Sequence, residues 1–236
     1  MKILWAITGA GHFLDETIEV IEVLATDDNT ITIATSNAAE EVLKLYGYTK
    51  KIQDILSIRN ENEYFNDQMQ KYSYPLSGKL THEKYDVIII APLTANSTAK
   101  IVHGIADTLI TNIAAQSGKG QIPLITLPVD QKQGLIKTTI PPYIKKDRCS
   151  KHTNCPPQKI CPTDAIQPPH IDKQKCTNCK KCENTCLNDA IKLDEKIELY
   201  IRKIDAQNTE KLKQIENITV VNHPYDIYGE INLLKK

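Results

Sequence analysis

Short apolar runs alternate with longer amphipathic segments over the first 130 residues. The apolar runs, each expected to be a strand, are residues 2–8, 30–36, 85–94 and 122–130. The segments between them repeat apolar residues at helical spacing, and they are residues 13–26, 37–47 and 95–117, the last divided around Gly104. An unbroken run such as "YDVIIIAPLT" is typical of a parallel strand covered on both faces. The pattern predicts an α/β fold, a Rossmann-like or flavodoxin-like open parallel sheet with helices on both sides.

Two stretches depart from this pattern. Residues 56–80 are polar and aromatic, and we expect a long loop or a helical excursion beside the ligand site. Its tyrosines, Tyr64, Tyr72 and Tyr74, would form a substrate wall, a docking surface or only a packing contact between subunits. From about Pro141 to Leu193 the chain is rich in Cys, Pro, Lys and Asn. Such a segment lacks the apolar residues for a core of its own and needs a cross-link or a cofactor.

Regular structure is expected again after the cysteine-rich stretch. Residues 196–204 and 218–224 have the pattern of strands, and residues 208–216 that of a helix. The cysteine segment is therefore inserted into the α/β domain and not added to its end. The predicted divisions are a flavin-binding domain at 1–144, an inserted domain at 145–194 and a return to the first domain at 195–236.

All seven cysteines lie between Cys149 and Cys186. The odd number excludes complete pairing, and clustering of this kind favours metal or cluster ligation over disulfides. Residues 176–186 follow the spacing C-x2-C-x2-C-x3-C, which suits a cubane iron–sulfur cluster because three thiolates wrap one cluster and the fourth reaches its neighbour. The alternative is a zinc site, which more often uses two separated C-x2-C pairs.

The sequence repeats itself at "CPTDAI" and "CLNDAI", as the two halves of a two-cluster ferredoxin do. One 4Fe-4S cluster is then expected on Cys176, Cys179, Cys182 and Cys161. The other is expected on Cys186, Cys149 and Cys155, with His152 as the fourth ligand because C-x2-H-x2-C keeps the ligand spacing. The alternative is that His152 is a solvated loop residue, and two extra residues precede Cys161. This second cluster would then lack one protein ligand, have three irons or be absent.

Composition narrows the class of protein. The formal net charge of the 236-residue chain is zero, so nothing favours a nucleic-acid partner or a charged membrane surface. No apolar run approaches the length of a membrane span. The chain begins with only Lys2 before its apolar run and has no signal-peptide pattern, so a cytoplasmic location is expected.

Small and hydroxyl residues follow three of the predicted strands. "TGAGH" (8–12) precedes a helix, where backbone amides can hold an anion, although an ordinary tight turn would look the same. Ser36 and Asn37 precede the next helix, where they would hold a phosphate or only cap the helix. After the third strand, "TANST" (94–98) would let a flat ring approach the backbone and offer donors to its carbonyls and phosphate.

These motifs, with "TGAGHF", "TSNAAEEVL" and "APLTANST" together, resemble those of the homo-oligomeric FMN flavoproteins that include phosphopantothenoylcysteine decarboxylase. "LPVDQKQG" and the ferredoxin-like segment resemble the archaeal iron–sulfur flavoproteins that include dihydromethanopterin reductase (acceptor). The resemblance implies FMN sites near subunit interfaces of an oligomer. By matching motif, the residues expected to contact FMN are Gly9, Ala10, Gly11, His12, Ser36, Asn37, Thr94, Ala95, Asn96 and Thr98, with Asp107 and Asp130 as weaker candidates.

The resemblance implies an oxidoreductase in which a ferredoxin or another low-potential donor reduces the clusters, the clusters reduce FMN, and FMN reduces dihydromethanopterin to the tetrahydro form. His12, His103 and Asp130 are the candidates for supplying a proton. The alternative is a non-enzymatic relay between ferredoxin and another redox protein. An FMN-dependent decarboxylase is disfavoured because His103 replaces the usual Asn, and because that chemistry needs no clusters.

Overall fold

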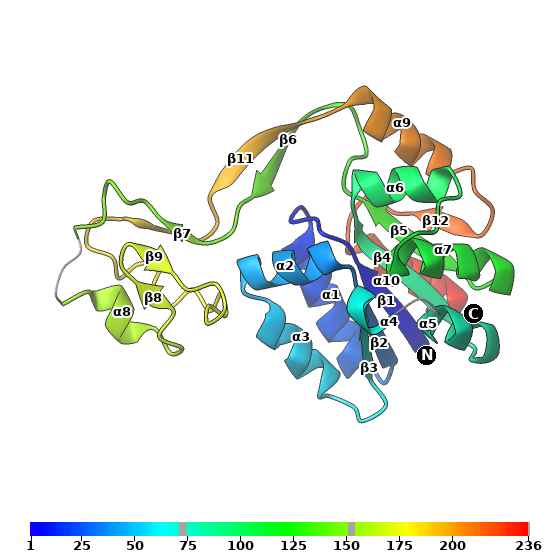
Figure 1. Ribbon diagram of the computed structural model, residues 1–236, viewed down its shortest axis with the longest axis horizontal. Coiled ribbons are helices and arrows are strands. Elements are labelled where there is room, and N and C mark those ends of the chain that lie inside the picture. Colours follow the sequence, from blue (N-terminus) through cyan, green and yellow to red (C-terminus); the bar gives the residue numbers. More distant parts are fainter. Residues whose placement is uncertain (71–74, 151–153, 236) are drawn as a thin grey trace.

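A computed structural model describes residues 1–70, 75–150 and 154–235 of the chain. Its centre is a six-stranded sheet in which every neighbouring pair runs parallel, in the order β12-β5-β4-β1-β2-β3 (Figure 1). The strands are β1 (Lys2–Ile7), β2 (Thr30–Thr35), β3 (Glu63–Asn66), β4 (Val87–Leu93), β5 (Leu124–Pro128) and β12 (Ile218–Val220). This is the doubly wound order, so the predicted open parallel sheet is confirmed.

Helices cover both faces of the sheet. They are α1 (Leu14–Thr26), α2 (Asn37–Tyr46), α3 (Thr49–Leu56), α4 (Asp67–Gln70), α5 (Pro75–His82), α6 (Ala95–Val102), α7 (Leu109–Gly120), α9 (Lys203–Leu212) and α10 (Asp226–Leu234). In β1, Trp5 points to the core beneath α1, α2, α3 and α10, whereas Leu4 points to the core beneath α5, α7 and α9. Successive side chains of a strand alternate between faces, which is why β1 is apolar throughout.

Several elements differ from the prediction. The helical excursion expected at residues 56–80 is present as α4 and the first part of α5, but the strand β3 was not expected there; it is an edge strand of four half-buried residues, too short and polar to resemble the central strands. Tyr72 and Tyr74 lie outside the described residues. The predicted division of 95–117 around Gly104 is confirmed, because α6 and α7 are separated there. No helix of the described residues is long and apolar enough to cross a membrane.

An antiparallel ribbon leads out of the α/β body and back. It pairs β6 (Gly134–Thr139) with β11 (Lys196–Ile201) over six residues of each strand. The strand predicted at 196–204 ends at Ile201 and belongs to this ribbon and not to the main sheet, and the helix predicted at 208–216 begins earlier, as α9 (Lys203–Leu212). Figure 1 shows the ribbon carrying the cysteine segment (residues 145–194) to one side of the body, level with α2 and α3.

The cysteine segment has little regular structure. Its short elements, with the strand that enters it, are β7 (Tyr143–Ile144), α8 (Pro156–Ile160), β8 (Ile166–Gln167), β9 (His170–Ile171) and β10 (Ile191–Lys192). A small core of Ile, Ala and Leu side chains lies at its centre, and Cys149, Cys161, Cys176, Cys182 and Cys186 pack against it. Few apolar residues and many thiols agree with the expectation that this segment depends on more than its own core.

Candidate functional site

The carboxyl ends of β1 and β4 lie side by side at the centre of the sheet. The chain moves from β1 toward one edge and from β4 toward the other, so the loops that follow, residues 8–12 and 94–98, diverge, and we call the place between these two loops the crevice. Thr8 ties the two ends together: its hydroxyl donates to the Pro92 carbonyl at 2.6 Å and accepts from the Thr94 amide at 2.8 Å. Doubly wound proteins bind ligands at this position.

The loop after β1 needs glycine at two places because other parts of the chain lie against it. A Cβ on Gly9 would come within 2.5 Å of the Ala38 Cβ, and one on Gly11 would come within 2.1 Å of the Tyr46 hydroxyl oxygen. Ala10, between them, is buried. The structure therefore brings this loop against both ends of α2, and the glycine requirement is explained by packing.

The amino end of α2 lies at the same edge of the sheet. Ser36 caps it, accepting from the Ala39 amide at 3.1 Å, and the Ser36 amide donates to the Ile7 carbonyl of β1. Asp67 accepts from the Asn37 amide at 3.0 Å and from the Leu109 amide at 2.8 Å. The sequence reasoning missed Asp67, which has no motif around it; its carboxylate holds the starts of α2 and α7 together.

The amino end of α6 is capped by Thr94, whose hydroxyl accepts from the Ser97 amide at 3.3 Å. Asp130, after β5, accepts a hydrogen bond from the Ala95 amide, and burial, then the nearby Asp205 carboxylate, raises the pKa of Asp130. The Thr98 hydroxyl donates to the Thr94 carbonyl at 3.0 Å and is buried. Of this stretch, Asn96 is the residue most exposed toward solvent.

The remaining candidates, His12, His103 and Asp107, do not all lie beside the crevice. His12 is in the loop after β1, its ring 3.9 Å from that of Phe13; burial lowers the pKa of His12, Glu16 opposes this, and His223 adds to it. His103 is exposed at the carboxyl end of α6, about two and a half helical turns from Thr94. Asp107 pairs with Lys100 at 2.8 Å. The structure thus brings His12 to the strand ends and leaves His103 at the far end of its helix.

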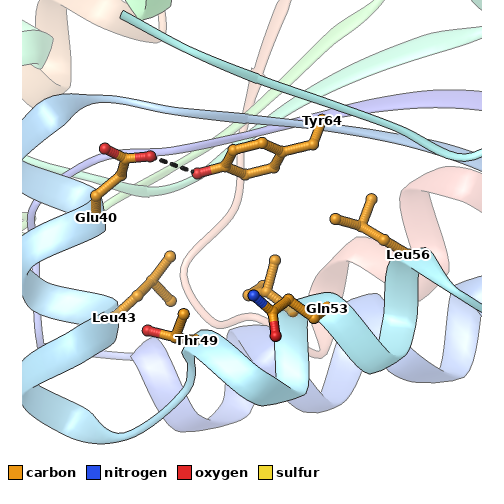
Figure 2. A pocket seen from close by; sticks show the side chains of 7 residues that line it. Glu40, Leu43, Thr49, Gln53, Leu56 and Tyr64 are labelled. Carbon is orange, nitrogen blue, oxygen red and sulfur yellow. Dashed lines mark hydrogen bonds between the residues drawn. The ribbon is translucent and has the colours of Figure 1, made fainter. Parts of the chain in front are cut away.

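A separate hollow of about 320 Å³ opens between α2, α3 and β3 (Figure 2). Its walls are mostly apolar, and Glu40 and Tyr64 meet along one side of it, opposite Thr49 and Gln53 (Figure 2). The Tyr64 hydroxyl donates to the Glu40 carboxylate at 2.7 Å, and Asn66 donates to the same oxygen at 2.7 Å. Burial raises the pKa of Tyr64 to about 12. Tyr64, expected in a loop, therefore fixes the edge strand against α2.

The cysteines of the inserted segment fall into two groups. In the first, burial raises the pKa of Cys182 to about 11, and three other thiols lie close enough to raise it further, namely Cys176, Cys161 and Cys179. Burial likewise raises the pKa of Cys176, with Cys161 and Cys179 adding to it. These are the four residues that the repeat assigns to one cluster.

The second group is Cys149, Cys155 and Cys186, which line one small cavity together with Pro156 and Pro168. His152 lies outside the described residues. Among residues 1–70, 75–150 and 154–235, no three His, Cys, Asp or Glu side chains converge closely enough to hold a single metal ion. A cubane cluster makes a different demand, because each of its four thiolates binds a different iron.

A buried cation lies beside the first group. The Lys173 ammonium is buried and has no hydrogen-bond partner among the described residues. Burial lowers its pKa, and the Cys176 thiol acts in the opposite direction. An unpaired buried cation is costly, and a cluster bound by four thiolates carries net negative charge that would offset that cost. The donor set and this cation both fit an iron–sulfur cluster at Cys161, Cys176, Cys179 and Cys182.

The strand order, which reverses between β1 and β4, defines a doubly wound α/β protein, a class that binds ligands at the carboxyl ends of the strands where the order reverses. A family model described as Flavoprotein matches residues 1–134, and the chain belongs to this family. The match ends where the ribbon begins, so it covers the strand-end loops and leaves the cysteine segment outside.

Relatives extend the likeness to nearly the whole chain. A dihydromethanopterin reductase (acceptor) of Methanosarcina mazei is 36% identical over 230 residues, covering 94% of this chain and 95% of the relative. One from Methanocaldococcus jannaschii is 39% identical over 264 residues, covering 99% and 96%. DmrB of Burkholderia xenovorans, solved in complex with FMN and described as a cubic protein cage for redox transfer, is 28% identical with a TM-score of 0.63, covering 98% of this chain and 93% of that one.

Proposed function

We propose that this protein is an iron–sulfur flavoprotein reductase that reduces dihydromethanopterin to tetrahydromethanopterin. The observation that carries the proposal is the pairing of two features in one chain: a Flavoprotein fold with its crevice at β1 and β4, and two groups of thiols in a segment inserted after β6. The likeness to two enzymes named for this reaction, over more than nine-tenths of the chain, supports the substrate.

FMN would lie in the crevice, where it would accept electrons singly and deliver a hydride equivalent to the pterin. The loop Gly9–Gly11 would lie against the ring, and Asn96 would donate to it. The amino ends of α2 and α6, with the Ser36 and Ser97 hydroxyls, would hold the phosphate. The Ala95 amide is already bound to Asp130, so Ala95 would contact FMN through its methyl group.

The cysteine segment would be a ferredoxin-like domain spanning residues 145–194, inserted between residues 1–144 and 195–236. Cys161, Cys176, Cys179 and Cys182 would hold one 4Fe-4S cluster, with Lys173 compensating its charge. Cys149, Cys155 and Cys186 would supply three ligands to a second, for which His152 is the proposed fourth. A low-potential donor of the ferredoxin class would feed the clusters.

We also propose a homo-oligomer with FMN near the subunit interfaces. The support is the likeness to a flavoprotein described as a cubic cage. A site near an interface would let the neighbouring subunit close the exposed side of the crevice around Asn96 and Asn37, which are both exposed in the single chain.

The test is anaerobic purification followed by reduction with dithionite and addition of dihydromethanopterin. The proposal expects FMN, iron and labile sulfide in the protein, and flavin reoxidation matched by tetrahydromethanopterin formed. A Cys179→Ala variant should lose one cluster's iron and most of the activity while keeping FMN. Rapid electron exchange with ferredoxin beside unchanged dihydropterin would instead establish the non-enzymatic relay.

A further inference from the structure

The cysteine segment is connected to the α/β body by the ribbon, and one of its loops also packs directly on the end of α2. Gly47 ends α2 with φ of 81°, a left-handed conformation that favours glycine. A Cβ there would lie 2.9 Å from the Cys176 carbonyl oxygen and 2.9 Å from the Asn178 amide nitrogen. Figure 1 shows the loops of the segment beside this end of α2. Gly47 therefore lets the backbone around Cys176 approach the flavoprotein fold.

Polar groups surround the same contact. The Asn178 side-chain amide donates to the Tyr48 hydroxyl at 3.5 Å, and that hydroxyl is also hydrogen-bonded to Asp15. Burial raises the pKa of Asp15, and the Tyr48 hydroxyl and then the charge of Lys180, in the same loop as Asn178, act in the opposite direction. Tyr48, the residue after Gly47, and Asp15 of α1 thus help to hold the loop of Cys176–Cys179 against α1 and the end of α2.

The residue before Gly47 reaches the crevice. The Tyr46 hydroxyl packs on the backbone of Gly11, because a Cβ added to Gly11 would lie only 2.1 Å from the hydroxyl oxygen. The same hydroxyl donates to the Thr139 carbonyl, at the end of β6, at 2.7 Å. Tyr46 and Gly47 are consecutive, so two residues connect the loop proposed to contact FMN with the loop that carries Cys176.

The other thiol group lies away from this contact. Cys155 precedes α8, and Figure 1 places α8 on the side of the segment remote from α2. Cys149 and Cys186 line the same cavity as Cys155 and so belong to that side. The two groups are therefore not equivalent with respect to the crevice.

We infer that the cluster on Cys161, Cys176, Cys179 and Cys182 is the one that reduces the flavin, across the Tyr46–Gly47 contact, and that the cluster on Cys149, Cys155 and Cys186 receives electrons from the external donor. This inference rests on the proposed function. Each crossing oxidises the cluster by one electron and reduces the flavin by one; two crossings and two protons from solvent complete the reduction. The one-electron donor, an iron–sulfur protein of low potential, restores the cluster each time.

Gly47→Ala tests the contact, and Gly104→Ala is its matched control. Gly104 also has a left-handed backbone, with φ of 70°, but a Cβ there meets nothing within 4 Å. In both variants an alanine must adopt a left-handed backbone, which destabilises the folded state, but only Gly47→Ala should push the loop of Cys176 away. Amide hydrogen exchange should therefore rise in residues 43–50 and 174–182 of Gly47→Ala alone, with iron, sulfide and FMN content unchanged in both.

Stopped-flow mixing with dithionite then separates cluster reduction from flavin reduction. We expect the flavin phase to slow at least tenfold in Gly47→Ala and to stay within twofold of the unaltered protein in Gly104→Ala. Asn178→Gly, which keeps the left-handed backbone but removes the amide that reaches Tyr48, should slow the same phase by a smaller factor and serves if Gly47→Ala does not fold.

The outcomes separate the two proposals. One outcome overturns this inference alone: Gly47→Ala binds FMN and clusters, its amide hydrogen exchange shows that the loop is displaced, and its rate of flavin reduction is unchanged. Electrons must then enter elsewhere, such as from a neighbouring subunit. If the unaltered protein binds no iron or no FMN, the proposed function is overturned, and this inference with it.

Discussion

Gly9 is a residue whose identity is fixed by a neighbour that lies far away in the sequence. Its missing side chain allows the loop after β1 to lie against the first turn of α2, with the Ala38 Cβ at 2.5 Å from the position of a Cβ. The β1 loop and the start of α2 are both proposed to contact FMN. The packing of Gly9 on Ala38 therefore controls how well these two parts of the proposed FMN site are aligned.

Gly9→Ala should lower the free energy of unfolding by about 1–3 kcal/mol, because the added methyl group overpacks a closed contact, and it should weaken FMN binding. Gly229→Ala is the control: Gly229 lies inside α10, where a Cβ meets nothing within 4 Å, so this change should stabilise the protein by about 0.5–1 kcal/mol. Urea unfolding and FMN titration measure both effects. Equal stability changes in the two variants would contradict the explanation.

We expect the partly buried His12 side chain to make the stability of the protein depend on pH. Burial lowers its folded pKa below the ordinary value of 6.5, Glu16 opposes this, and His223 adds to it. The unfolded chain then binds a proton at a higher pH than the folded chain does, so His12 makes stability fall as pH drops through and below 6.5. His12→Gln should lose less stability than the unaltered protein between pH 7.5 and pH 5. Thermal melts across this range measure it, and parallel curves for the two proteins would contradict the assignment.

Single residues also mark the limit of sequence reasoning. Gly9, Gly11, Ser36 and Thr94 could be selected because they follow apolar runs, and the structure gathers the loops that carry them at one edge of the sheet. Asp67 could not, because its role depends on two helix starts brought together only by folding. The occupied Ala95 amide and the internal bond of Thr98 were hidden for the same reason.

At the scale of elements, the amino end of α6 combines a stabilising cap with a proposed ligand contact. Thr94→Ala should lower the free energy of unfolding by about 1 kcal/mol, because the Ser97 amide loses its partner, and should also weaken FMN binding. Thr94→Ser should retain both properties. Thr108→Ala removes the equivalent cap of α7 and should cost similar stability without changing FMN affinity. Equal FMN affinities for Thr94→Ala and Thr108→Ala would show that Thr94 acts only as a cap.

Elements with strong periodicity were predictable, and those defined by their neighbours were not. The four central strands, and α6 and α7 divided around Gly104, follow from runs that are buried on both faces or at helical spacing. The edge strand β3 has only half-buried residues, so its sequence carries no clear pattern. Residues 196–201 have the alternation of a strand, but only the fold shows that their partner is β6.

For the whole molecule, the ribbon of β6 and β11 is an exposed connection that needs support. Two-stranded ribbons are marginally stable alone. Leu135 and Tyr200 face each other across it and are 68% and 59% exposed. Contact with another copy of the chain would cover this exposed apolar pair, which agrees with the proposed homo-oligomer.

Leu135→Glu should therefore reduce the oligomer to smaller species, because burial of a Leu side chain contributes about 1.5–3 kcal/mol at each contact and a buried unpaired carboxylate opposes assembly. Lys137→Ala changes a residue on the same face of the ribbon that is already polar and exposed, and should leave the oligomer intact. Analytical ultracentrifugation of both variants, with FMN content measured alongside, tests this. Since the FMN sites are proposed to lie near the interfaces, the smaller species should also hold FMN less tightly. An unchanged sedimentation coefficient for Leu135→Glu would mean that the ribbon serves only to carry the cysteine segment, and that subunits meet through another surface.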